Sequence, residues 1–191
     1  MIIKKILEKY LKGENISENL KNLEFNKAFP EIACLKNVMQ DKIYHPEGDV
    51  LTHILMMIEV LDINERNENI FWSIIYHDSG KFLTYPTFKN HEKKSVEILE
   101  KNKFKLNLKD DQIEEIKKLI LHHETILKLM LNNSINEESV KKLSLEVNLK
   151  DLLKLYKCDV LGRGYKNNYL ELKAIDEVEK LYNLQTKTYE L

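Results

Sequence analysis

The chain has 191 residues, of which 43% are hydrophobic and 32% charged, and its 30 Lys and Arg nearly balance its 31 Asp and Glu. This length and composition suit one globular domain with its own hydrophobic core. The formal net charge of −1 excludes the broad basic field by which proteins hold long nucleic acids or anionic membranes. Any nucleic-acid substrate must therefore bind at a local site.

Apolar residues recur every three or four positions along most of the sequence, which predicts an all-α fold. We expect helices over these ranges: 2–12, 17–26, 50–62, 68–78, 91–102, 111–131, 137–146, 149–161 and 168–184. Two proline-containing segments, 29–48 and 81–89, are expected to be loops, apart from a helical turn around 32–38.

Residue types that begin and end helices stand at several of these boundaries. Asp49, Asn90 and Asp110 occupy positions where a side-chain oxygen can cap a first helical turn. Gly80 and Gly162 come at the ends of apolar helical segments, and we expect them to stop those helices.

The cysteines and the first residues bear on the cellular compartment. Cys34 and Cys158 form no CxxC pair, which argues against a disulfide scaffold and against a zinc ribbon. Residues 1–15 lack a signal-peptide pattern, and the apolar stretch 50–61 is too short and too often interrupted by polar residues to span a bilayer. We therefore expect a reduced, cytoplasmic protein with no membrane segment.

All six histidines lie between positions 45 and 123. Each one alone would ordinarily be a surface residue or a hydrogen-bonded core residue, so the argument rests on the helix faces that they share. One stripe of the expected helix 111–131 contains Ile113, Ile116, Ile120, His123 and Leu127. His123 should therefore point into the core, while His122 lies about 100° around the helix.

Three more apolar helices also direct polar groups inward. Asp159 continues a stripe made of Leu149, Leu152 and Tyr156, and a buried carboxylate is costly unless it is paired or bound to metal. A structural role, as a cap or as the partner of a lysine, remains an alternative for Asp159. His77 and Asp78 end one strongly apolar helix, and His53 lies in the first turn of another.

Imidazole nitrogens and carboxylate oxygens that converge in a core are good ligands for first-row divalent metals. The set contains no thiolate, which argues against a structural zinc site. The sequence therefore predicts a metal site at the centre of the helical core.

The order of these residues resembles a known family. His53, the His77–Asp78 doublet and Asp159 resemble the H…HD…D signature of the HD superfamily of metal-dependent phosphohydrolases, and HDSGK at 77–81 is similar to the family's HDxGK.

A narrower resemblance covers about residues 29–164. The segment FPEIACLKNVMQDKIYHPEGDVLTH at 29–53 resembles the entry to the HD domain of bacterial CCA-adding tRNA nucleotidyltransferases. NHEKKSVEIL, LILHHETIL and CDVLGRG then follow in the same order. No GS…D.D motif precedes residue 29, so we expect the nucleotidyltransferase head domain of those enzymes to be absent.

The resemblance implies an all-α HD-domain helical bundle with a central metal site, formed by residues 1–191 as a single domain. We expect N-terminal helices at 1–28, the HD core at 29–164 and a C-terminal helix at 165–191.

The resemblance also implies roles for individual residues. Four would be the primary metal ligands: His53, His77, Asp78 and Asp159. A second metal would be held by His91 and by one or both of His122 and His123, of which the helix face favours His123. Lys81 matches the lysine of HDxGK, near the substrate phosphate, and Arg163 matches an arginine that follows the last ligand in the tRNA-enzyme group. His45 is either a substrate-binding residue or a loop residue that fixes the entry to the following helix.

The activity implied is hydrolysis of a phosphoester, with one or two divalent ions, Mn, Fe, Co, Ni or Zn, as cofactor. Asp78 would bridge two ions, and Lys81 and Arg163 would neutralise the phosphate.

We expect nucleotides or RNA ends with 2′,3′-cyclic, 2′- or 3′-phosphates as substrates. The alternatives are an HD hydrolase of free nucleoside mono- or polyphosphates, and a non-catalytic HD fold that binds RNA or protein. A missing ligand would favour the last alternative, and the sequence lacks none.

Overall fold

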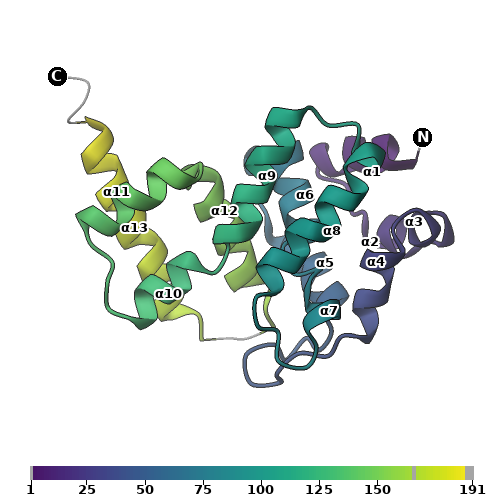
Figure 1. Ribbon diagram of the computed structural model, residues 1–191, viewed down its shortest axis with the longest axis horizontal. Coiled ribbons are helices and arrows are strands. Elements are labelled where there is room, and N and C mark those ends of the chain that lie inside the picture. Colours follow the sequence, from purple (N-terminus) through teal and green to yellow (C-terminus); the bar gives the residue numbers. More distant parts are fainter. Residues whose placement is uncertain (1, 165–166, 188–191) are drawn as a thin grey trace.

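The computed structural model describes residues 2–164 and 167–187, and this part of the chain is all-α, as predicted (Figure 1). The helices are α1 (Ile2–Leu11), α2 (Ser17–Lys21), α3 (Leu23–Ala28), α4 (Pro30–Ala33), α5 (Val50–Val60), α6 (Glu68–Tyr76), α7 (Lys81–Thr84), α8 (His91–Leu106), α9 (Asp110–His122), α10 (Thr125–Leu131), α11 (Glu137–Glu146), α12 (Leu149–Gly162) and α13 (Tyr169–Lys187). Two short 3₁₀ helices are η1 (Cys34–Asn37) and η2 (Ile63–Glu65).

The helices form a bundle around α5 and α12, which pack against each other (Figure 1). Helix α6 contacts both of them and also α8 and α9, while α13 packs on α10, α11 and α12. The N-terminal helices and α13 lie at opposite ends of the long axis of the molecule. In the described part of the chain, no helix has both the length and the apolar character needed to cross a bilayer.

Helix α5 is apolar on nearly every side because it lies inside the bundle. Its Asp49 cap is confirmed, since the carboxylate accepts a hydrogen bond from Thr52 N at 2.9 Å. The other two predicted caps have different outcomes. Asn90 is the N-cap of α8, as predicted, but its backbone is left-handed and its side chain makes no cap hydrogen bond. The prediction for Asp110 is wrong, since it is the first residue of α9, after the N-cap Lys109.

The single helix expected over 111–131 is divided in the structure into α9 and α10. The division occurs at His123, whose Nδ1 donates to the carbonyl oxygen of Ile120 at 2.6 Å. A side chain that donates a hydrogen bond to a helix carbonyl competes with the backbone N–H that would bond to the same carbonyl and continue the helix. The break therefore comes from the histidine that the apolar stripe predicted to point inward.

Gly162 does not stop a helix after its end, as the sequence suggested, but lies inside the last turn of α12. A Cβ atom there would come within 2.7 Å of Met57 Cγ and 2.8 Å of the backbone nitrogen of Met57 on α5. Glycine thus permits the close approach of the two helices that carry His53 and Asp159.

Candidate metal centre

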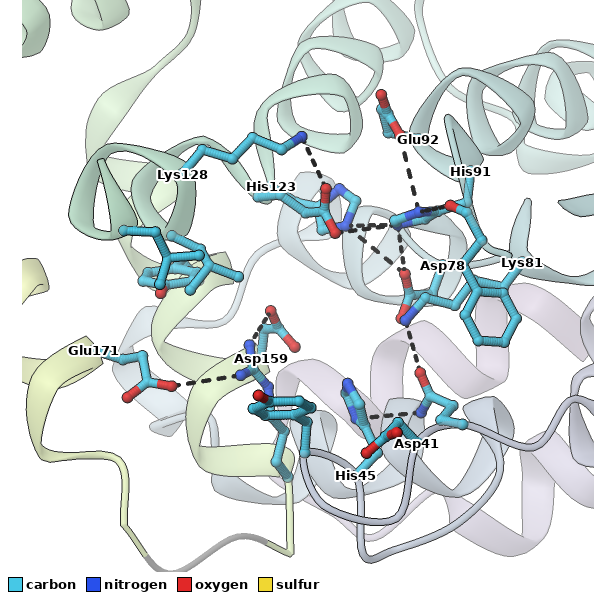
Figure 2. Close-up of a pocket in the computed structure, with 18 of the residues that line it drawn as sticks. Asp41, His45, Asp78, Lys81, His91, Glu92, His123, Lys128, Asp159 and Glu171 are labelled. Atoms are coloured by element: carbon cyan, nitrogen blue, oxygen red, sulfur yellow. Dashed lines mark hydrogen bonds and ion pairs between the residues drawn. The ribbon is translucent and has the colours of Figure 1, made fainter. Parts of the chain in front are cut away.

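Most of the predicted polar residues converge on one cavity of about 800 Å³ (Figure 2). Its walls come from the loop before α5, the segment around α7, the first turn of α8, helix α10, the end of α12 and the start of α13. His53 and His77 are almost completely buried beside it. Side chains that are up to 106 residues apart in the sequence therefore share one site.

One cluster joins α5, the end of α6 and α12. His53 Nε2 lies 2.9 Å from Asp159 Oδ1, and the ring centroids of His53 and His77 are 5.7 Å apart. One ligand atom from each of these residues falls within 4.8 Å of the others. This spacing suits a single ion that all three residues contact.

A second cluster consists of Asp78, His91 and His123, whose side chains turn toward one another in Figure 2. His91 Nε2 lies 3.0 Å from Asp78 Oδ1 and 3.1 Å from His123 Nε2. Asp78 Oδ2 is also 3.2 Å from Nε2 of His77 in the first cluster. Asp78 therefore connects the two clusters, as a residue that bridges two ions would.

The backbone determines which nitrogen each of three histidines presents to the site. Nδ1 of His77, His91 and His123 donates to the carbonyl oxygen three residues earlier, at 2.9, 2.9 and 2.6 Å respectively. Each ring therefore presents its Nε2 atom to the site, and this atom carries a lone pair when the ring is neutral.

These lone pairs test whether the site fits a metal ion. Two Nε2 lone pairs 3.1 Å apart, on His91 and His123, repel each other unless a proton or a cation lies between them. His77 Nε2 and Asp78 Oδ1 are buried and, within the described residues, make no well-aligned hydrogen bond. The donor set therefore fits divalent metal ions, with imidazole and carboxylate ligands and carbonyl-oriented rings.

The charges around the site keep its carboxylates ionised. Burial alone would raise the pKa of Asp78, but the neighbouring His77 and Lys81 hold it well below its usual range. In the same way, Arg163 and the hydrogen bond from His53 overcome burial and lower the pKa of Asp159. Both carboxylates are thus available as anionic ligands at neutral pH.

Lys81 lies beside Asp78. Its Nζ is 2.7 Å from Asp78 Oδ2 and donates to Gln40 Oε1, also at 2.7 Å. The ammonium group is 5.6 Å from the centre of the Phe88 ring. Lys81 therefore lines the cavity as a buried cation next to the connecting carboxylate.

Arg163 lines the cavity on the side of Asp159. Its Nη2 donates to Asp159 Oδ2 at 3.0 Å, and its Nη1 lies 3.7 Å from Glu171 Oε1 on α13. Both ends of the guanidinium thus face carboxylates, so Arg163 also holds a candidate metal ligand in place.

His45 lies at the edge of the same site. Its Nδ1 is 2.8 Å from Glu47 Oε1, and its ring stands edge-on to His53 with centroids 5.0 Å apart. The ring of His45 lines the cavity, as a substrate-binding residue would, and it also contacts the loop that enters α5.

His122 is the one candidate ligand that the structure does not bring into the site. Its Nε2 lies 3.7 Å from Glu146 Oε2 on α11, and it belongs to none of the potential metal clusters of the described residues. The sequence included His122 among the candidate ligands, and the structure places it outside both clusters. Consecutive residues point in different directions, so His123 faces the cavity while its neighbour faces outward.

Gly80 completes the turn after the His77–Asp78 doublet. It has no left-handed backbone and does not act as a stop. A Cβ there would overlap the carbonyl oxygen of His91 and come within 2.6 Å of Ser95 N. Ser95 Oγ accepts from Gly80 N at 2.8 Å and donates to His77 O at 2.7 Å. The doublet is thus fastened directly to the helix that begins with His91.

A family model described as the HD domain matches residues 50–164, which is more than half of the chain. The chain belongs to the HD domain family. HD domains bind divalent metals and form a superfamily of metal-dependent phosphohydrolases. The residues that carry the family signature are those that the structure gathers around the cavity.

Curated relatives include proteins named multifunctional CCA protein. Those of Shewanella frigidimarina and Hahella chejuensis are 32% and 35% identical over 77 and 75 residues. That of Psychromonas ingrahamii is 29% identical over 103 residues, or 52% of this chain and 25% of the relative. The first two matches cover 38% and 37% of this chain and less than a fifth of each relative, 19% and 18%.

Two acidic residues beside the site were not predicted from the sequence. Glu47 contacts both His45 and His53, and Glu124 Oε1 lies 4.0 Å from His91 Nε2. Glu47 stands between two candidate histidines, and Glu124 directly follows the His122–His123 pair. Closeness in sequence to histidines was the available signal, but acidic residues are too common for it to single these two out.

Proposed function

We propose that this HD protein is a phosphoesterase that hydrolyses nucleotides or RNA ends bearing a 2′,3′-cyclic, 2′- or 3′-phosphate. The observation that carries the proposal is the pair of ligand clusters that meet at Asp78 in one cavity, with Lys81 and Arg163 on its walls. Two adjacent metal-ligand sets and two cations form an arrangement suited to one phosphoryl group.

When bound, the ions would lower the pKa of a water molecule and polarise the phosphoryl oxygens. His53, His77, Asp78 and Asp159 would hold the first ion, while Asp78, His91 and His123 would hold the second. An imidazole-rich set favours Mn, Fe, Co, Ni or Zn over Mg or Ca.

The remaining work falls to the protein's own side chains. Lys81 offers its ammonium group as a compact positive charge beside Asp78. Arg163 keeps Asp159 oriented and ionised, and a phosphate could share its guanidinium with that carboxylate. Burial of these groups strengthens their electrostatic attraction for a phosphate dianion.

Three observations support the substrate class. A cavity of about 800 Å³ is in the size range of sites for one nucleotide-sized molecule. The net charge of −1 supplies no surface that could follow a duplex backbone. The matched relatives are named multifunctional CCA proteins, which favours a substrate related to the end of an RNA.

The test is a comparison of substrates under one metal condition. Protein loaded with Mn²⁺, Co²⁺, Ni²⁺ or Zn²⁺ would be assayed with 2′,3′-cyclic AMP, 2′-AMP, 3′-AMP, 5′-AMP and a diadenosine polyphosphate. We expect the cyclic and 2′-phosphate esters to be hydrolysed fastest, with no turnover in excess chelator. Identically loaded Asp78→Asn protein controls for contaminating phosphatases.

The other outcomes would replace the proposal. Much faster hydrolysis of 5′-AMP or of the diadenosine compound would make this protein a hydrolase of free nucleoside phosphates. Metal-loaded protein that hydrolyses none of the compounds would favour a non-catalytic HD fold.

A further inference from the structure

A buried carboxylate outside the family signature lies against the site. The side chain of Glu47 is only 1% exposed, although it belongs to the loop before α5. Its Oε1 lies 2.8 Å from His45 Nδ1 and 3.0 Å from His53 Nδ1. Its Oε2 accepts a hydrogen bond from Gly164 N at 3.1 Å. One carboxylate thus contacts two histidines and the chain segment that follows α12.

The position of His53 explains why it needs such a partner. Nδ1 of His77, His91 and His123 donates to backbone carbonyls at helix ends or in the turn before a helix. His53 is instead the fourth residue of α5, where the nearby carbonyls already accept backbone hydrogen bonds of the helix. An acceptor for its Nδ1–H must come from outside the helix. Glu47 Oε1 lies 3.0 Å away, although among the described residues this nitrogen makes no well-aligned hydrogen bond.

The nitrogen that Glu47 contacts determines what the other nitrogen can do. With the proton on Nδ1, the Nε2 lone pair of His53 points toward Asp159, 2.9 Å away, where both residues would hold an ion. Carboxylates that orient metal-binding histidines in this way typically contribute about 10- to 100-fold to metal affinity.

Glu47 also connects this histidine to the far side of the site. Gly164 directly follows Arg163, which pairs with Asp159. A Cβ on Gly164 would come within 3.4 Å of Glu47 N, so the loop and the end of α12 are in direct contact. The same carboxylate therefore fixes His53 and the chain segment beside Arg163.

We infer that Glu47 is a positioning residue, which orients His53 for metal binding and joins it to the end of α12. This inference rests on the proposed metal centre, but it does not depend on which phosphate ester is hydrolysed.

The experiment measures metal affinity without substrate. Metal-free wild-type, Glu47→Gln, Glu47→Asp and Glu31→Gln proteins would be titrated calorimetrically with Mn²⁺ or Co²⁺, and visible absorption would report the Co²⁺ coordination. Glu31 is the matched control, because its carboxylate is also partly buried but lies on α4, outside the cavity lining. Circular dichroism of the metal-free proteins would verify folding.

We expect Glu47→Gln to weaken binding by about 10- to 100-fold and to change the Co²⁺ spectrum, with full occupancy restored at higher metal concentration. Glu31→Gln should bind as the wild type does. If Glu47→Gln does not fold, Glu47→Asp is judged by the same criterion, since it keeps the charge but withdraws the carboxylate by one methylene.

Wild-type affinity in the folded Glu47 variant would overturn the inference. So would the loss of one bound ion that excess metal does not restore, because Glu47 would then be a ligand itself. Wild-type protein that binds metal but hydrolyses no phosphate ester would contradict the proposed function and leave this inference intact.

Discussion

Proton competition at His53 should make metal binding depend steeply on pH. Both ring nitrogens of His53 lie within 3.0 Å of a carboxylate oxygen, one on Asp159 and one on Glu47. Burial alone would lower the pKa of His53, but these two contacts outweigh it and raise the pKa to about 9. The doubly protonated ring has no lone pair for a metal, so binding must release a proton.

The size of the effect follows from this pKa. At pH 7 only about 1% of a histidine with a pKa near 9 is deprotonated, so the apparent metal affinity should be about 100-fold weaker than above pH 9. Binding should therefore strengthen about tenfold between pH 7 and 8, and about fivefold more between pH 8 and 9.

Stability of the metal-free protein should change in the opposite sense. A histidine whose folded pKa exceeds its unfolded value of about 6.5 stabilises the fold fully below that pH. This contribution disappears as the pH rises through 9. The free energy of unfolding of metal-free protein should thus fall over this range while metal affinity rises.

Calorimetric titration with Mn²⁺ or Co²⁺ at several pH values from 7 to 8.5 provides the measurement. Repeating it in buffers with different ionisation enthalpies counts the released protons, and we expect about one from His53. His122→Ala protein is the control, because His122 lies outside the clusters and its loss should preserve the pH dependence. Constant affinity across this range, with no proton released, would refute the reasoning.

Three further predictions concern the same site. Asp78→Asn should abolish hydrolysis and weaken metal binding, because Asp78 connects the two clusters, whereas Asp62→Asn should leave activity unchanged. Steady-state kinetics and metal analysis of both variants would test this, and similar losses in the two variants would contradict the assignment of Asp78 to the site. His123→Ala should weaken binding of the second ion by more than the roughly 10- to 100-fold that a partner outside the ligand shell contributes, whereas His122→Ala should leave this affinity unchanged. Calorimetric titration compares the two variants, and a greater loss in His122→Ala would show that His122 is the ligand. Gly80→Ala should destabilise the protein by roughly 1–3 kcal/mol, because its Cβ would overlap the backbone of α8; thermal or denaturant unfolding measures this, and unchanged stability would refute the packing argument.

Local features of the sequence were enough for the helices and for part of the site. Apolar spacing predicts a helix because residues three and four apart share one face, and this rule depends only on neighbouring positions. For the same reason, the stripes that contain His123 and Asp159 predicted that both residues point inward. Asp49 was a readable cap because its partner, Thr52 N, is only three residues away.

Features that depend on a distant partner could not be predicted in this way. The role of Gly162 follows from its close approach to Met57 on another helix. The division of 111–131 follows from a contact between His123 and Ile120, which is local but which apolar spacing does not display. Glu47 accepts a hydrogen bond from Gly164, 117 residues later in the chain, and sequence spacing carries no information about such a pair.

The sequence by itself determined the all-α character, the family and most of the residues around the cavity, because these depend on local periodicity and on the order of a few residue types. Only the tertiary structure decided that His122 faces away and that Asp78 connects two clusters. It alone brought Glu47 against His53. Those outcomes depend on how closely the helices pack, since ligand geometry is set by distances of a few ångströms between segments far apart in the chain.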